Sequence, residues 1–172
     1  MRSALDLPSL VVASARGDRD AFGELYVRYS RAVHGVLVAR LSREDAEDLV
    51  HDVFMHAFAH LRDLREPGAF GGWICTIARR RAADHHRRAR VTDPPADTLA
   101  GSDRPDVTAD AHRALEAIQD LPAAYRETLV LRLVEGLNGP EIAALTGLTP
   151  DSVRVNLHRG FRLLRERLGV AT

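Results

Sequence analysis

The sequence predicts an all-α protein of two small helical domains joined by a flexible acidic linker, and three observations lead to this prediction. Hydrophobic residues make up 45% of the 172 residues but aromatic residues only 5%, so the core is aliphatic, which favours helices over sheets. Apolar residues recur at helical spacing through residues 9–90 and again from Ala111. Between these segments, residues 92–110 hold three prolines and five Asp against one Arg, which is typical of an extended linker.

The composition also excludes several classes of protein. The 24 basic residues, all arginine, balance 24 acidic ones, which excludes a uniformly basic coat but not a segregated basic surface. The single cysteine, Cys75, excludes a disulfide framework and a Cys-rich zinc site. The N-terminal segment lacks the apolar run of a signal peptide or membrane span. We therefore expect a cytoplasmic protein without direct membrane insertion.

A helix is predicted over residues 43–61, with Ser42 as its N-cap. A step of 100° per residue gathers six apolar residues on one side: Ala46, Leu49, Val50, Val53, Ala57 and Leu61. A second set lies nearly opposite: Glu44, Asp48, His51, Asp52 and Met55. A solvated face would explain this second set, but its charges are almost all negative, which favours docking on a basic protein partner.

The loop at residues 62–69 leads into a helix predicted over residues 70–90. Its first turns carry an apolar stripe that includes Trp73, which we expect to pack in the core. Its last turns hold six arginines and two histidines within residues 79–90, against one Asp. Guanidinium groups this close repel one another unless anions lie nearby, so the cluster indicates a nucleic-acid strand.

Enzymatic and metal-binding signals are weak. His56 and His60 are spaced i, i+4, as two metal ligands on a helix could be, but no Glu forms an HExxH pattern and no third ligand is evident. No phosphate-binding glycine loop, nucleophile elbow or carboxylate pair is found, and Cys75 is expected to be a small buried hydrophobe. We expect no enzymatic activity, no cofactor and no metal.

Residues 139–158 have the spacing of a helix-turn-helix. Ala143 lies where two helices cross closely, Gly147 where the turn requires positive φ, and Val153 where the second helix needs an apolar anchor. Asn138 with Glu141 predicts a capping box, and Thr149 caps a second helix that has proline at its first position. A simple αα-hairpin would share this spacing, but five arginines against one acid in residues 152–172 favour a DNA-recognition helix.

Four strings in this order resemble the extracytoplasmic-function (ECF) subfamily of the sigma-70 family, the bacterial RNA polymerase initiation factors. They are GDRDAFGELYVRYSRAV, DAEDLVHDVFMHAF, AFGGWICTIARRRAADHHRRAR and LPAAYRETLVLRLVEGLNGPEIAALTGLTPDSVRVNLHRGFRLLRERL. The resemblance implies sigma region 2 at residues 9–91, a linker at 92–110 and sigma region 4 at 111–170.

The resemblance also implies partners and site residues. A core-binding motif at about 48–61 would dock on the β′ clamp helices of core RNA polymerase, region 4 would meet the β flap, and an anti-sigma factor would control the protein. Residues 62–90 would recognise and melt the −10 element of promoter DNA, with the 62–69 loop capturing a flipped base. The implied −10 contacts are Arg79, Arg80, Arg81, His85, Arg87 and Arg88. The implied −35 contacts are Thr149, Asp151, Ser152, Arg154, Val155, Asn156, His158 and Arg159.

Some positions depart from the family pattern. Val155-Asn156 replace a common Ser-Arg, and Asn can read adenine bidentately. Gly160 interrupts the recognition helix and would allow a bend, and Gly71-Gly72 stand where bulkier residues are usual. Two other hypotheses remain: a stand-alone helix-turn-helix regulator, which usually dimerises to bind two half-sites, and a helical enzyme or metalloprotein that uses the histidines.

Overall fold

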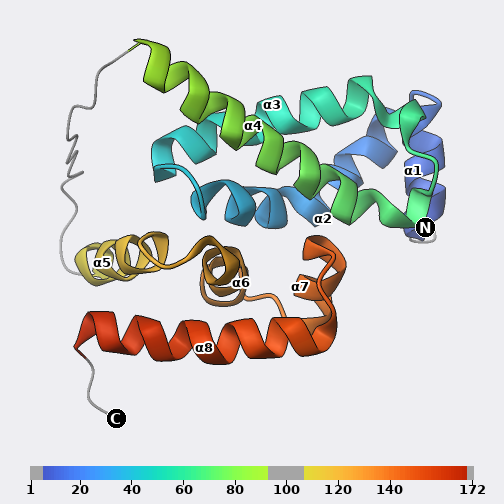
Figure 1. Cartoon of the computed structure of the whole chain (residues 1–172). Coiled ribbons are helices and arrows are strands. Elements are labelled where there is room, and N and C mark those ends of the chain that lie inside the picture. The colour runs from blue at the N-terminus through green and yellow to red at the C-terminus, as the bar shows by residue number, and fades with distance from the viewer. Residues whose placement is uncertain (1–5, 93–106, 170–172) are drawn as a thin grey trace.

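The computed structural model describes residues 6–92 and 107–169, and the described part contains helices but no strand. The first group of elements, which we call the N-terminal module, lies above the second, the C-terminal module, in Figure 1. The N-terminal module contains α1 (Leu7–Ala15), α2 (Arg19–Val38), α3 (Arg43–Ala59), the 3-10 turns η1 (Leu61–Asp63) and η2 (Pro67–Ala69), and α4 (Phe70–Thr92). The C-terminal module contains α5 (Val107–Gln119), α6 (Ala123–Leu133), α7 (Gly139–Thr146) and α8 (Pro150–Leu168).

Helix α2 is the centre of the N-terminal module and packs against α1, α3 and α4. Its buried face follows helical periodicity and meets Phe54 of α3, whose ring lies 4.4 Å from that of Tyr26. Its N-cap is Asp18, whose carboxylate accepts hydrogen bonds from the N–H groups of Asp20 and Ala21. Gly17, at φ +97°, turns the chain between α1 and α2.

Helix α6 is the centre of the C-terminal module, and α8 packs along it. A Cβ at position 160 would lie only 2.9 Å from Leu129 Cδ1 and 3.3 Å from Tyr125 Cβ. Gly160 therefore lets α6 and α8 approach closely, whereas the sequence suggested that it would allow a bend. Helix α8 runs as one element from Pro150 to Leu168.

The predicted linker is helical at both of its ends. Helix α4 continues to Thr92, and α5 begins at Val107, so residues 107–110 are helical where the sequence predicted linker. The rest of the predicted linker, residues 93–106, lies outside the described residues. No helix within 6–92 or 107–169 has the length and apolar character needed to cross a membrane.

Candidate partner and nucleic-acid interfaces

Helix α3 presents the acidic set on one exposed face, as the sequence predicts. Its N-cap is Ser42, whose hydroxyl accepts a hydrogen bond from the Asp45 N–H at 3.1 Å. Ala46, Val53, Phe54 and Ala57 are buried on the opposite side; Phe54 is an anchor that the apolar pattern missed. The exposed face, which we call the α3 acidic face, consists of Glu44, Asp48, His51, Asp52 and Met55, and the Met55 side chain is 52% exposed. A thioether among carboxylates suits a protein partner with both basic and apolar groups.

The basic residues of α4 do not form one surface. Arg80, Arg87 and Arg88 are exposed, whereas Arg79, Arg81 and His85 are only partly so. Several of them already contact protein groups: Arg87 pairs with Asp84, Arg81 Nη2 lies 2.9 Å from His56 Nδ1, and His85 Nε2 lies 3.5 Å from Asp45. Local charge repulsion, from which the sequence predicted a nucleic-acid strand, is thus partly relieved within the protein.

Arg79 is the predicted −10 contact that the structure places most differently. Its guanidinium donates to Glu127 of α6, with Nη2 2.7 Å from Oε1, and also to the Leu145 carbonyl at 3.0 Å. Arg40 of α2 donates to the other Glu127 oxygen at 2.6 Å. Glu127 lies 48 residues from Arg79 along the chain. No local sequence pattern signals such a pair, so sequence reasoning missed Glu127.

The environment of Glu127 keeps its carboxylate charged. Burial raises the pKa of this carboxyl, but the hydrogen bond from Arg79 and the charges of Arg40 and Arg79 outweigh burial, so its pKa lies below the ordinary value. Burial also raises the pKa of the Cys75 thiol, which interacts with this cluster, to about 12. A carboxylate with a depressed pKa contributes stability above its ordinary pKa and loses it as pH falls through the depressed value. The ion pairs therefore persist at neutral pH.

The segment that follows α3 is held against α1. It folds into η1 and η2, and Arg62 Nε donates to the Ala15 carbonyl at 3.0 Å. Trp73, just beyond this segment on α4, is half-buried and packs against the core, in line with its expected role. Helix α1 therefore supports the loop for which the family resemblance implies base capture.

Helices α7 and α8 form the helix-turn-helix, and the predicted caps, turn glycine and apolar anchor are present. Asn138 and Glu141 make a reciprocal capping box, with hydrogen bonds of 3.0 and 2.7 Å. Gly147 ends α7 in the left-handed conformation, and Thr149 caps α8 by accepting from the Ser152 N–H. Val153 is buried as the apolar anchor.

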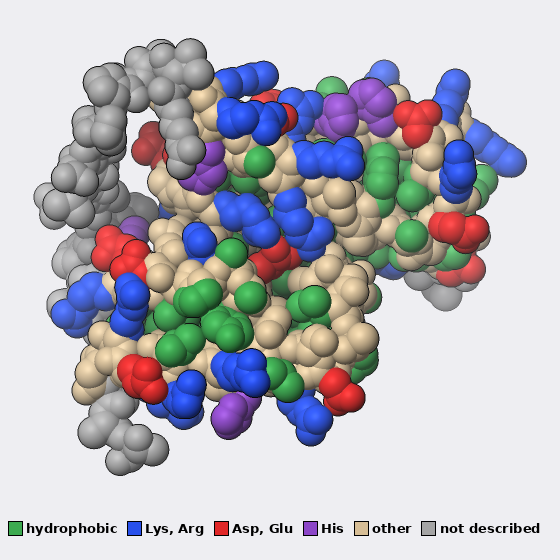
Figure 2. Space-filling view, in the orientation of Figure 1, with side chains coloured by type: hydrophobic (Ala, Val, Ile, Leu, Met, Phe, Trp, Pro, Cys, Tyr) green, Lys and Arg blue, Asp and Glu red, His purple; other side chains and the backbone are tan. Residues whose placement is uncertain are grey.

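The predicted −35 residues lie on or near the outer face of α8, where basic side chains follow the lower edge of the molecule in Figure 2. Ser152 and Asn156 are half-buried and the rest of the set is exposed: Thr149, Asp151, Arg154, Val155, His158 and Arg159. The Asn156 side-chain amide donates to the Ala124 carbonyl of α6 at 3.1 Å. That amide must leave α6 before it can read a base in two hydrogen bonds.

Replacing Gly147 with alanine is expected to lower the free energy of unfolding by about 1–2 kcal/mol, since an L side chain is strained at φ +74°. The measurement is urea unfolding of the full chain. Gly23→Ala is the control, because Gly23 lies inside α2, away from positive φ, and a Cβ there meets nothing within 4 Å. Equal stability of the two variants would contradict the prediction.

The chain matches known proteins over both modules. The family model of sigma-70 region 2 matches residues 25–92, and that of sigma-70 region 4 matches residues 111–164. RNA polymerase sigma factor CarQ of Myxococcus xanthus is 39% identical over 89% of this chain and 92% of its own length. The ECF RNA polymerase sigma factor SigD of Mycobacterium bovis is 34% identical over 96% of this chain and 85% of its own length. The chain belongs to the ECF sigma factors.

Two solved structures share the fold of this ECF sigma factor. CnrH in complex with the cytosolic domain of CnrY gives a TM-score of 0.70 at 24% identity, covering 96% of this chain and 99% of that one. The sigma factor RpoE in complex with the anti-sigma factor NepR from Bartonella quintana gives 0.63 at 21% identity, covering 88% and 98%. The helical arrangement of both modules therefore belongs to the ECF sigma factor fold.

Proposed function

We propose that this ECF sigma factor docks on core RNA polymerase through the α3 acidic face and contacts promoter DNA with both modules. The observation that carries the proposal is the separation of two chemically different faces. The α3 acidic face lies on the N-terminal module and suits a basic protein surface. The exposed part of α8, the second helix of the capped helix-turn-helix, is basic. Clamp helices of the β′ subunit are the partner of the first face, and −35 DNA is the partner of the second.

The −10 element is assigned to the N-terminal module. Arg80, Arg87 and Arg88 extend along the exposed side of α4 and suit a phosphate backbone. The loop with η1 and η2, braced by α1, is the place for a flipped base, whose unstacking costs a few kcal/mol. Three further groups already contact protein atoms and contribute to DNA binding once their protein partners release them: Arg79, Arg81 and His85.

Control by an anti-sigma factor is part of the proposal. Both solved relatives described above are complexes, one of them with a protein that is named as an anti-sigma factor. Such a partner would act in the cytoplasm by covering the faces that polymerase and DNA need. The nucleotidyl transfer belongs to the polymerase, and the sigma factor itself supplies promoter choice rather than catalysis.

Run-off transcription tests this function. The purified protein is mixed with sigma-free core polymerase and fragmented genomic DNA, and the RNA 5′ ends are sequenced. We expect new start sites that share two upstream motifs. In the double variant R154A/R159A the motif near −35 should lose its influence on start-site choice. Arg165 is an exposed arginine further along α8, and Arg165→Ala should leave the influence of that motif unchanged. A protein that ignores polymerase and binds palindromic DNA as a dimer would instead be a stand-alone regulator.

A further inference from the structure

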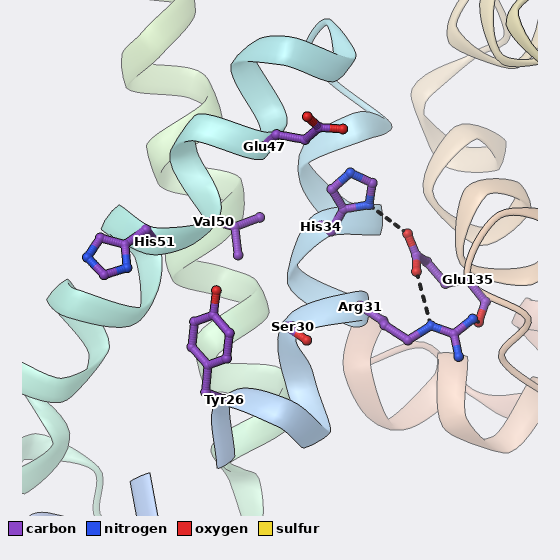
Figure 3. A pocket seen from close by; sticks show the side chains of 8 residues that line it. All are labelled: Tyr26, Ser30, Arg31, His34, Glu47, Val50, His51 and Glu135. Carbon is purple, nitrogen blue, oxygen red and sulfur yellow. Dashed lines mark hydrogen bonds and ion pairs between the residues drawn. The ribbon is translucent and has the colours of Figure 1, made fainter. Parts of the chain in front are cut away.

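The outer face of α8 differs from the surfaces on which this protein pairs its own charges. Between the modules, Glu135 has its Oε1 2.9 Å from His34 Nδ1 and its Oε2 3.6 Å from Arg31 Nε, as the dashed lines in Figure 3 show. These groups satisfy one another within the protein. On the outer face of α8, by contrast, an apolar side chain is exposed among basic ones: Val155 is 41% exposed.

Val155 lies in the second turn of α8, on the side that faces away from the core. It follows the buried anchor Val153 by two positions. Two residues correspond to about 200° around a helix, so Val155 points away from the side on which Val153 is buried. In a helix-turn-helix, the N-terminal residues of the second helix contact base edges in the major groove. Val155 therefore occupies a base-contacting position if α8 binds DNA as proposed.

The polar side chains of the first two turns of α8 are already bound to one another. The hydroxyl oxygens of Thr149 and Ser152 lie 2.8 Å apart, and that of Thr149 also accepts from the Ser152 N–H. The Arg154 guanidinium donates to the Asp151 carboxylate at 3.1 Å. Both members of this ion pair are exposed, so Arg154 can exchange it for a phosphate contact at little cost. These groups suit capping and phosphate binding rather than base reading.

Asn156 has the chemistry to read adenine, but its side chain is engaged elsewhere. Reading of adenine in two hydrogen bonds uses both the amide N–H and the side-chain oxygen of asparagine. The Asn156 side chain is half-buried, and its amide donates to the Ala124 carbonyl of α6 at 3.1 Å. Asn156 thus holds α8 against α6, and the neighbouring Val155 is the side chain presented to the groove.

A valine side chain matches one particular group in the major groove. The 5-methyl group of thymine is the apolar group that base pairs display there, and small apolar side chains contact it. Because branching at Cβ restricts valine to one main rotamer in a helix, the two methyl groups of Val155 are fixed before DNA arrives. Burial of one methyl-sized group corresponds to about a fourfold change in affinity.

We propose that Val155 is a specificity-determining residue that recognises the 5-methyl group of one thymine in the −35 element. The inference rests on the proposed function, because it requires α8 to lie in the major groove of that element. It assigns the readout of an A·T pair to an apolar contact with the thymine, and not to hydrogen bonds from Asn156 to the adenine.

Arg159 indicates what lies beside that thymine. It follows Val155 by one turn on the same exposed face, and within residues 6–92 and 107–169 it has no hydrogen bond or ion pair. Arginine is the commonest side chain that reads guanine. Four helical residues rise about 6 Å and a base-pair step is about 3.4 Å, so we expect a guanine within about two steps of the thymine.

Removal of single groups from promoter DNA tests the contact. The −35 motif found by run-off transcription is placed in a synthetic promoter, and each thymine in it is replaced in turn by uracil, which lacks only the 5-methyl group. Fluorescence anisotropy of the labelled promoter measures its dissociation constant for the full sigma factor bound to core polymerase. We expect uracil at one thymine position to weaken binding by about fourfold.

Val155→Ala should abolish this discrimination, because the shorter side chain does not reach the methyl group. The variant should bind the promoters with thymine and with uracil equally well. Alanine is favourable at an exposed helical position, so the fold is retained, and circular dichroism checks this. Val134→Ala is the matched control: Val134 is also an exposed valine of the C-terminal module, at 45%, but it follows α6. It should keep the wild-type effect of uracil.

The adenine opposite the sensitive thymine separates Val155 from Asn156. Its replacement by 7-deazaadenine removes the N7 acceptor that asparagine would use and leaves the thymine methyl group in place. We expect this replacement to leave the dissociation constant unchanged. A promoter that is weakened by 7-deazaadenine but not by uracil would overturn the proposal and assign the base to Asn156.

Failure of the inference and failure of the proposed function give different results. Transcription from sites that share a −35 motif, with no effect of uracil at any position or with no A·T pair in the motif, would overturn the role of Val155 alone. The same holds if Val155→Ala still distinguishes thymine from uracil. A protein that directs no polymerase-dependent start would overturn the proposed function, and the contact of Val155 with it.

Discussion

Replacing Phe54 with alanine is expected to lower the free energy of unfolding by about 3–5 kcal/mol, the largest stability effect that we predict. The Phe54 side chain is only 1% exposed, and its ring lies 4.4 Å from that of Tyr26 and 6.2 Å from that of Phe22. Truncation removes apolar burial and both ring contacts, and the helices α2 and α3 cannot collapse fully into the space. Urea unfolding followed by circular dichroism measures the change.

Val27→Ala is the control for this experiment. Val27 lies on α2 with 76% of its surface exposed, so its truncation should change the free energy of unfolding by less than about 0.5 kcal/mol. A Phe54→Ala variant as stable as Val27→Ala would mean that α3 does not dock on α2 through this ring. It would also remove the physical basis for the orientation of the α3 acidic face.

The double variant D48R/D52R is expected to weaken binding to core polymerase by about 100-fold, the largest functional effect that we predict. Both carboxylates lie on the exposed side of α3, one turn apart, where reversal replaces attraction to basic clamp helices with repulsion. Close interfacial charge pairs contribute about 1.5 kcal/mol or more each, and two of them give the expected factor. Fluorescence anisotropy of the labelled sigma factor against core polymerase measures the dissociation constant.

The control is the double variant E24R/E116R, which makes the same change in net charge at exposed positions on α2 and α5. It should bind core polymerase like the wild type. The defect of D48R/D52R should shrink as salt is added, because exposed charges are screened over about 10 Å at 0.1 M. Equal weakening in both double variants would mean that overall charge, rather than the α3 acidic face, governs docking.

Much of the fold could be predicted because its signals are local. Ser42, Asn138 and Thr149 cap helices through hydrogen bonds to residues three positions away, and Gly147 adopts the left-handed conformation that its position in the turn requires. Such signals involve neighbours within one turn of helix and are therefore readable without a structure. The α3 acidic face follows in the same way from helical periodicity.

Two departures from the sequence predictions involve partners distant in the chain, and a third concerns the start of a helix. Gly160 looked like a helix interruption, but it lies against Leu129, and the Asn156 amide is bound by the Ala124 carbonyl, 32 residues away. Residues 107–110 looked like linker because of their composition, but they are the first turn of α5. Composition and periodicity describe one segment at a time, so neither the approach of Gly160 to Leu129 nor the hydrogen bond from Asn156 to Ala124 is visible in them.

By itself, the sequence determined the helical class, the two modules, the helix-turn-helix and the acidic face of α3. Only the tertiary structure decided that Arg79 pairs with Glu127, that Glu135 meets His34, and that Gly35 makes room for it. The physical reason is how far apart along the chain the interacting residues lie. Caps and amphipathic faces arise from residues within a few positions of one another, whereas a buried ion pair depends on which helices pack together, and that packing is decided by the whole apolar core at once.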